Sequence, residues 1–161
     1  IGAVVGLVAI TPAAGFVAIP QSIIVGVVAS MVSNIAISIK QKSTLDDTLD
    51  VFPCHGIGGM VGMLLTGVFA SKAVNSIGND GLAYGNPSFF FTQVKALLIV
   101  VAYSFTVSYL IFKFINFILP IRVTEEEEEL GLDASQHNEK YSQGTLLVHQ
   151  KDGLIAEVDA D

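Results

Sequence analysis

Long apolar stretches separated by short polar connections occupy most of this chain, up to about residue 120. A helix that crosses a membrane needs about 20 consecutive, mostly apolar residues. The stretches that suit such helices are residues 1–10 (the end of one span), 20–39, 50–70 and 89–119. The pattern therefore predicts an all-α membrane protein, with a transmembrane region over residues 1–121 and a polar tail over residues 122–161.

Helix boundaries are predicted from proline, glycine and capping residues. The turn Thr11–Phe16 has Pro and Gly where the first helix should stop, and Pro20 suits the first turn of the next. After the polar connection 40–49, Asp50 is expected to cap the third helix. Pro53 then falls in the first turn of that helix, where its missing N–H costs little.

The last apolar segment, 89–119, is longer than a single span requires. Thirty-one helical residues measure about 46 Å, whereas the hydrocarbon core of a bilayer is about 30 Å thick. We therefore expect this helix to be tilted or to project beyond the bilayer. Lys95 and Lys113 lie near the two ends of this segment and are interpreted as anchors that extend their ammonium groups to the interfaces.

Positive charges predict the orientation of the helices. Lys40 and Lys42 lie in one connection and Arg122 follows the last helix, while the connection between them holds only Lys72. Since consecutive helices alternate in direction, Lys40, Lys42 and Arg122 are expected on the same side of the membrane. Cytoplasmic loops carry the excess of Lys and Arg, so the tail is expected to be cytoplasmic.

Composition agrees with a membrane protein, since 52% of residues are hydrophobic and 14% are charged. The net charge of −7 comes largely from the tail, where Glu125–Glu129 supply five of the 15 acidic residues, so nucleic-acid binding is not expected. Cys54 is the single cysteine and is interpreted as a small apolar helix residue. The sequence begins at Ile1, inside an apolar run, and not with Met and a basic, signal-like segment. We therefore expect the chain to be a fragment.

His55 is the one residue of the apolar segments with chemistry suited to function inside a membrane, because an ionisable side chain there is costly. Steps of three and four residues predict one helix side that carries this histidine with Val51, Gly58, Gly59, Gly62 and Thr66. Gly58, Gly59 and Gly62 are interpreted as helix-packing positions, since small residues four apart allow close helix contact.

An imidazole in apolar surroundings should be neutral, with one N–H donor and one acceptor lone pair. Such a group can bind a small polar solute, relay a proton or ligate a metal. Haem ligation is the rival hypothesis, but it normally requires a second axial ligand, and the apolar segments hold no other histidine. No metal, cofactor or enzymatic activity is expected.

Three stretches in the right order resemble the Amt/MEP ammonium transporters. Asp50–Gly59, followed by Val61–Gly62 and Leu65–Ala70, resembles the tenth helix of that family, which reads DVF-x-x-HG-x-x-G. Gly6–Phe16 is similar to the end of the eighth helix. Arg122–Val123, the glutamates and then Gly131, Asp133, His137, Glu139 and Tyr141 resemble the cytoplasmic tail. The resemblance covers residues 1 to about 141, and Ser142–Asp161 have no recognised counterpart.

This resemblance implies the C-terminal part of an eleven-transmembrane-helix fold with two inverted halves, a multi-pass protein of the cell membrane that forms homotrimers. His55 is similar to the second of two pore histidines, the first of which would lie upstream. Val51 matches a pore-lining position, and Asp50 is interpreted as a helix cap near the pore. The implied substrate is ammonium, which loses its water and a proton in an apolar pore, while potassium meets the full desolvation cost.

The tail has two interpretations. A run of glutamates is most often a solvated face. By resemblance, Gly131, Asp133, His137 and Tyr141 belong to an ordered tail that couples subunits, near the docking place of a PII-type regulatory protein. Residues 145–161 alternate partly as a short hairpin would, with its turn at Lys151–Gly153.

Three functions remain open from the sequence. The first is a channel-like ammonium transporter, the second is an ammonium sensor that uses the same fold with a signalling tail, and the third is a haem-bearing electron-transfer subunit. Rhesus proteins are a narrower competitor, and the DVFPCHG stretch and GLD tail fit the Amt pattern better.

Overall fold

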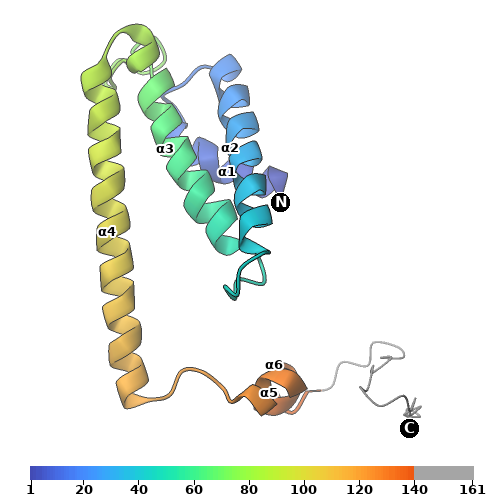
Figure 1. Cartoon of the computed structure of the whole chain (residues 1–161). Coiled ribbons are helices and arrows are strands. Elements are labelled where there is room, and N and C mark those ends of the chain that lie inside the picture. The colour runs from blue at the N-terminus through green and yellow to red at the C-terminus, as the bar shows by residue number, and fades with distance from the viewer. Residues whose placement is uncertain (140–161) are drawn as a thin grey trace. The chain divides into compact units, whose positions relative to one another are not determined.

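The computed structural model describes residues 1–139, and within these residues the regular structure is entirely helical. The elements are α1 (Gly2–Ile10), η1 (Thr11–Ala13), α2 (Ile19–Lys40), η2 (Phe52–Ile57), α3 (Gly58–Phe69), η3 (Leu82–Tyr84), α4 (Pro87–Ile118), α5 (Glu125–Leu130) and α6 (Leu132–His137) (Figure 1). The predicted hairpin at 145–161 lies outside the described residues. The all-α fold predicted from the hydropathy pattern is confirmed.

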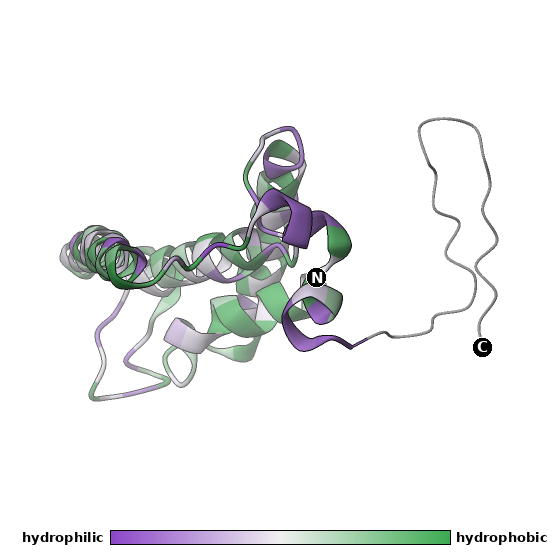
Figure 2. Ribbon diagram, turned by 90° about the horizontal axis from the view of Figure 1, so that it is seen from below, coloured by the Kyte–Doolittle hydropathy of each residue, from purple (hydrophilic) through white to green (hydrophobic). Residues whose placement is uncertain are grey.

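Three helical stretches in the described part are long and apolar enough to cross a membrane. They are Ile19–Lys40, Phe52–Phe69 and Pro87–Ile118, each close to a segment predicted from the sequence. Hydrophobic residues predominate along these helices, whereas α5 is hydrophilic because it consists mostly of glutamate (Figure 2). Contacts divide the chain into two units, Ile1–Tyr109 and Leu110–Asp161, and the boundary falls inside α4.

In the first unit, α1, α2 and α3 pack against one another (Figure 1). Their shared core consists of small and β-branched side chains, and its members are Val5, Ala9, Val25, Ala29, Ile37 and Cys54. Cys54 is 4% exposed and contributes to this core, in keeping with its interpretation as a small apolar residue. Small side chains bring the helix axes close together, so this packing depends on backbone-to-backbone contact.

The turn between α1 and α2 contains the signals that the sequence predicted there. Pro12 lies in the η1 turn, and Gly15 has a φ of 79°, a left-handed conformation that glycine adopts without steric cost. Pro20 occupies the first turn of α2. The helix ends at Lys40, and the N–H groups of Gln41 and Lys42 close its last turn by donating to the carbonyl oxygens of Ile37 and Ile39.

Helix α4 has no buried residue, although it is 32 residues long and mostly apolar. At 1.5 Å per residue it measures about 48 Å. Near its start, the side chains of Phe90 and Gln93 lie against Gly67 of α3, where a Cβ would meet them at 3.2 Å. A helix with so much exposed apolar surface requires lipid or further protein around it.

In the second unit, α5 and α6 form a small helical pair. Thr124 and Glu127 make a capping box, in which each side chain accepts a hydrogen bond from the other residue's backbone N–H. Gly131 joins the two helices with a φ of 92°, so a side chain at this position would be strained. The Ser135 hydroxyl donates to the Glu127 carbonyl oxygen at 3.2 Å and holds the pair together.

Candidate functional site

His55 lies in the π-helical turn Phe52–Ile57, directly before α3. Its side chain is exposed, while Pro53 and Cys54 on the other side of the turn are buried against the helical core. A π-helical turn accommodates an extra residue, and such turns occur frequently at functional sites. Pro53 lacks a backbone N–H and so donates no backbone hydrogen bond in this turn.

The turn changes which residues share a face with His55. The sequence predicted one side that carries Val51, His55 and the glycines, but Gly58, Gly62 and Thr66 are buried in the helical core. Val51 is 51% exposed, and His55 is exposed as well. The predicted common face is therefore wrong, because the π-helical turn shifts the register of the helix. Val51 and His55 lie on the outward side, and the glycines that follow them turn inward.

Glycines bring α3 close to α1. A Cβ on Gly62 would lie 2.1 Å from the carbonyl oxygen of Ala9, so the two backbones meet at this position. A Cβ on Gly58 would lie 3.3 Å from Cγ1 of Val5, whereas one on Gly59 would meet only Cγ1 of Val8 at 3.8 Å. Of these three glycines, Gly62 is therefore the one that the close approach of the α1 and α3 backbones requires.

The carboxylate of Asp47 caps the helix that carries His55. Its two oxygens accept hydrogen bonds from the N–H groups of Val51 at 2.8 Å and Phe52 at 2.9 Å. The N–H of Phe52 holds the pKa of Asp47 below its usual value, helped by the N–H of Val51 and the Lys40 ammonium and opposed by burial. Sequence reasoning did not identify this residue, because a capping side chain usually accepts from N–H groups two or three residues further on, whereas Asp47 accepts from groups four and five residues on.

Asp50 does not provide the side-chain cap that the sequence predicted. Its backbone carbonyl accepts from the N–H of Cys54 at 3.0 Å, as a residue at the start of a helix does. Its carboxylate, however, forms an ion pair with Lys40, with Oδ1 and Nζ 2.6 Å apart. The physical reason is the φ of 54° at Asp50, which turns the backbone into the helix while the side chain reaches the end of α2.

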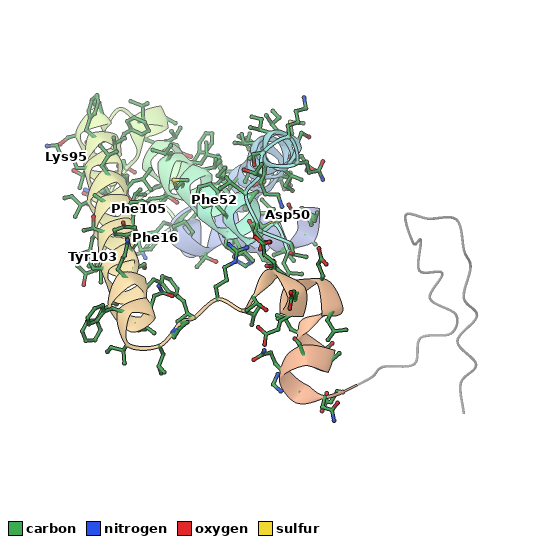
Figure 3. The ribbon with its side chains drawn as sticks, turned by 60° about the horizontal axis from the view of Figure 1, so that its bottom comes forward. Phe16, Asp50, Phe52, Lys95, Tyr103 and Phe105 are labelled. Carbon is green, nitrogen blue, oxygen red and sulfur yellow. The ribbon has the colours of Figure 1, made fainter. Side chains whose placement is uncertain are left out.

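The ring of Phe52 lies over Gly56. A Cβ on Gly56 would be 2.9 Å from Cδ2 and 3.1 Å from Cε2 of this ring. The Phe52 side chain is 62% exposed, at the start of the π-helical turn (Figure 3). An aromatic surface therefore adjoins the turn that holds His55, and the absence of a side chain at position 56 makes room for it.

A cavity of about 240 Å³ lies in the first unit, where η1 and the turn after it meet α3, α4 and the connection between α3 and α4. It is lined mainly by aromatic and small residues, namely Pro12, Phe16, Thr66, Gly78, Asn79, Phe89 and Gln93. Neither His55 nor Val51 lines it. The cavity is thus separate from the predicted pore residues.

The predicted tail residues that the structure describes all belong to the α5–α6 pair. Gly131 joins the two helices, Asp133 lies in the first turn of α6, and His137 is its last residue. The Asp133 carbonyl oxygen accepts from the N–H of Glu139 at 3.0 Å. Tyr141 lies outside the described residues.

Three helical stretches of membrane length in the described part of the chain define its class as a helical membrane protein. Comparison with known sequences then identifies the family. The chain belongs to the Ammonium Transporter Family, whose sequence model matches residues 1–142. The members of that family are transporters and not enzymes.

Similar proteins come from bacteria, archaea and fungi. The ammonium transporter of Bacillus subtilis is 47% identical over 146 residues, which are 90% of this chain and 36% of that protein. Ammonium transporter Amt1 of Archaeoglobus fulgidus is 41% identical, over 86% of this chain and 35% of its own length. This chain therefore spans about a third of the length of the curated relatives it matches.

Crystal structures of fungal Mep2 proteins share this fold. Mep2 of Saccharomyces cerevisiae superposes with a TM-score of 0.74 and 35% identity, over 83% of this chain and 31% of that one. Mep2 of Candida albicans gives a TM-score of 0.71 and 38% identity, over 78% of this chain and 29% of that one. The chain is accordingly a fragment of an all-helical transporter fold.

Proposed function

We propose that this protein conducts ammonium or ammonia across a membrane, through an apolar pore to which this chain contributes His55 and Val51. The observation that carries the proposal is the exposed position of His55 at the start of a helix of membrane length, beside an exposed valine one turn earlier. Membership of the family, whose relatives are named as ammonium transporters, supports the choice of substrate.

The chemistry of His55 suits this substrate. An imidazole with one N–H and one lone pair both donates to and accepts from ammonia. An ammonium ion that enters an apolar pore loses its hydration, and it escapes part of that cost by giving up a proton to the acceptor lone pair of a neutral pore imidazole. Potassium has no proton to lose, so it meets the whole desolvation cost and is excluded. A second histidine from another part of the full-length polypeptide would complete the pair.

We further propose that the chain is the C-terminal part of the transporter, from the end of the eighth helix to the tail. The order of its helices and the sequence motifs they carry support this placement. The full-length protein would then be a multi-pass homotrimer of the cell membrane with two inverted halves and a cytoplasmic tail. The α5–α6 pair, with Gly131, Asp133 and His137, would couple subunits and lie near the binding place of a PII-type regulator.

The two rival functions differ in what a purified protein does. A sensor with the same fold would bind ammonium without a matching flux, so uptake into vesicles separates sensing from transport. The haem hypothesis loses its basis through the family assignment, because the matched relatives are named as transporters.

His55→Ala and His55→Glu in the full-length protein test the pore assignment. Removing the imidazole leaves its buried partner without a hydrogen bond, at a cost of about 1–3 kcal/mol, or roughly 5- to 150-fold in rate. Ammonium uptake and potassium flux are measured in proteoliposomes at matched protein density. We expect His55→Ala to lower uptake, and His55→Glu to retain some transport with poorer exclusion of potassium.

Parental uptake together with parental exclusion of potassium in both His55 variants would show that this residue is not the selectivity element.

The tail is tested separately by Gly131→Asp, which places a side chain at a φ of 92°. We expect this variant to insert and to form trimers but to transport less. Unchanged uptake by a variant truncated after Arg122 would reduce the tail to a passive extension.

A further inference from the structure

We propose that Lys40 is a positioning residue for His55, and that it clamps the end of α2 to the segment that begins the histidine-bearing helix. The proposal rests on the proposed function of His55. It is carried by a set of contacts in the connection between α2 and the π-helical turn, all of them within the first unit of the chain.

The ammonium group of Lys40 joins two points of this connection. It forms the 2.6 Å ion pair with Asp50 and also donates a hydrogen bond to the backbone carbonyl oxygen of Asp47. The side chains of Lys40 and Asp50 are only 16% and 17% exposed. This is therefore not an ordinary surface ion pair, which is solvated and contributes little. Removal of one partner leaves the other charge partly desolvated and unpaired.

The two aspartates held by Lys40 make the first bonds of the histidine-bearing helix. The Asp47 carboxylate accepts from the N–H groups of Val51 and Phe52. The Asp50 carbonyl accepts from the N–H of Cys54, the residue next to His55. A continuous set of hydrogen bonds thus runs from the Lys40 ammonium to the turn that sets the direction of the imidazole.

The backbone at Asp50 explains why a clamp is needed. Its φ of 54° is uncommon for a residue with a side chain and persists where surrounding contacts hold it. The carbonyl that bonds Cys54 belongs to this residue, so a change of its backbone conformation changes the start of the helix. We infer that the ion pair with Lys40 is the contact that holds it.

Lys42 provides a matched control in the same connection. It lies two residues from Lys40 and is exposed, and its side chain forms no ion pair within the described residues. Both lysines carry the positive charge that orients a membrane protein. A role in orientation alone would make the two residues equivalent, whereas a clamp requires Lys40 only.

The test uses Lys40→Met, Lys40→Arg and Lys42→Met in the full-length protein, in a background whose cysteines other than Cys54 are replaced. Cys54 is 4% exposed and lies in the π-helical turn, so its labelling by a small methanethiosulfonate reagent reports the packing of that turn. Ammonium uptake and potassium flux are measured on the same samples, and size-exclusion chromatography verifies insertion and assembly.

We expect Lys40→Met to raise the labelling rate of Cys54 about tenfold and to weaken exclusion of potassium, because the Asp50 carboxylate is left without its cation. Lys40→Arg retains the charge and should keep parental values, as should Lys42→Met. Adding Asp50→Asn to Lys40→Met removes the unpaired charge and should restore part of the protection of Cys54.

Parental labelling and selectivity in Lys40→Met would overturn the proposal. Equal effects of Lys40→Met and Lys42→Met would overturn it too, since both would then act through orientation. If Lys40→Met exposes Cys54 while His55→Ala leaves selectivity unchanged, the pore assignment fails and the clamp on the turn stands.

Discussion

Gly62→Ala should destabilise the contact between α1 and α3 by about 1–3 kcal/mol, the range for overpacking a tight interior. A Cβ at this position would lie 2.1 Å from the carbonyl oxygen of Ala9 and 2.8 Å from its Cα. These are backbone atoms, so no side-chain rotation relieves the clash and the helices must separate. Alanine is the better helix former by about 0.8–1.0 kcal/mol, which offsets only part of this cost.

Gly59→Ala is the matched control in the same helix. Its Cβ would meet only Cγ1 of Val8 at 3.8 Å, an ordinary van der Waals distance. We therefore expect Gly59→Ala to be neutral or slightly stabilising. The assay is the midpoint of thermal unfolding of the full-length protein in detergent, followed by fluorescence-detected size exclusion. Equal midpoints for Gly62→Ala and Gly59→Ala would refute the inferred backbone contact.

Two further predictions concern the start of the histidine-bearing helix and the tail. Gly56→Ala should displace the ring of Phe52, because the new Cβ would lie 2.9 Å from Cδ2, and should alter ammonium uptake in vesicles. Adding Phe52→Leu should restore uptake, whereas failure of this rescue would show that the ring is not the cause. Thr124→Ala should increase deuterium uptake in α5 by removing half of the capping box.

The capping box should also respond to pH. The N–H and then the hydroxyl of Thr124 hold the pKa of Glu127 below its usual value. Its stabilisation of α5 is therefore complete above the unfolded pKa and is lost as the pH falls through the lowered folded pKa. Spectra that report helix content should be recorded in acid for the parental protein and for Glu127→Gln. They should show this loss only in the parental protein.

The helices follow from the sequence because apolar runs of about 20 residues have few alternatives in a membrane. Predicted segments 20–39 and 89–119 correspond to α2 at Ile19–Lys40 and α4 at Pro87–Ile118. Proline and glycine also indicated the turn after α1 correctly. Three stretches in the right order, among them the motif around His55, suggested the family, and the family match bears this out.

Which residues share the face of His55 was decided only by the tertiary structure. A constant helical step places Gly58 and Gly62 beside the histidine, but one π-helical turn changes the register and buries these glycines against α1. The cap and the ion pair at the start of the same helix were likewise beyond the sequence. Asp47 and Asp50 are both plausible caps, and the choice depends on where the ammonium of Lys40 lies, at the end of a different helix. Local sequence specifies a helix, whereas contacts between helices specify its phase.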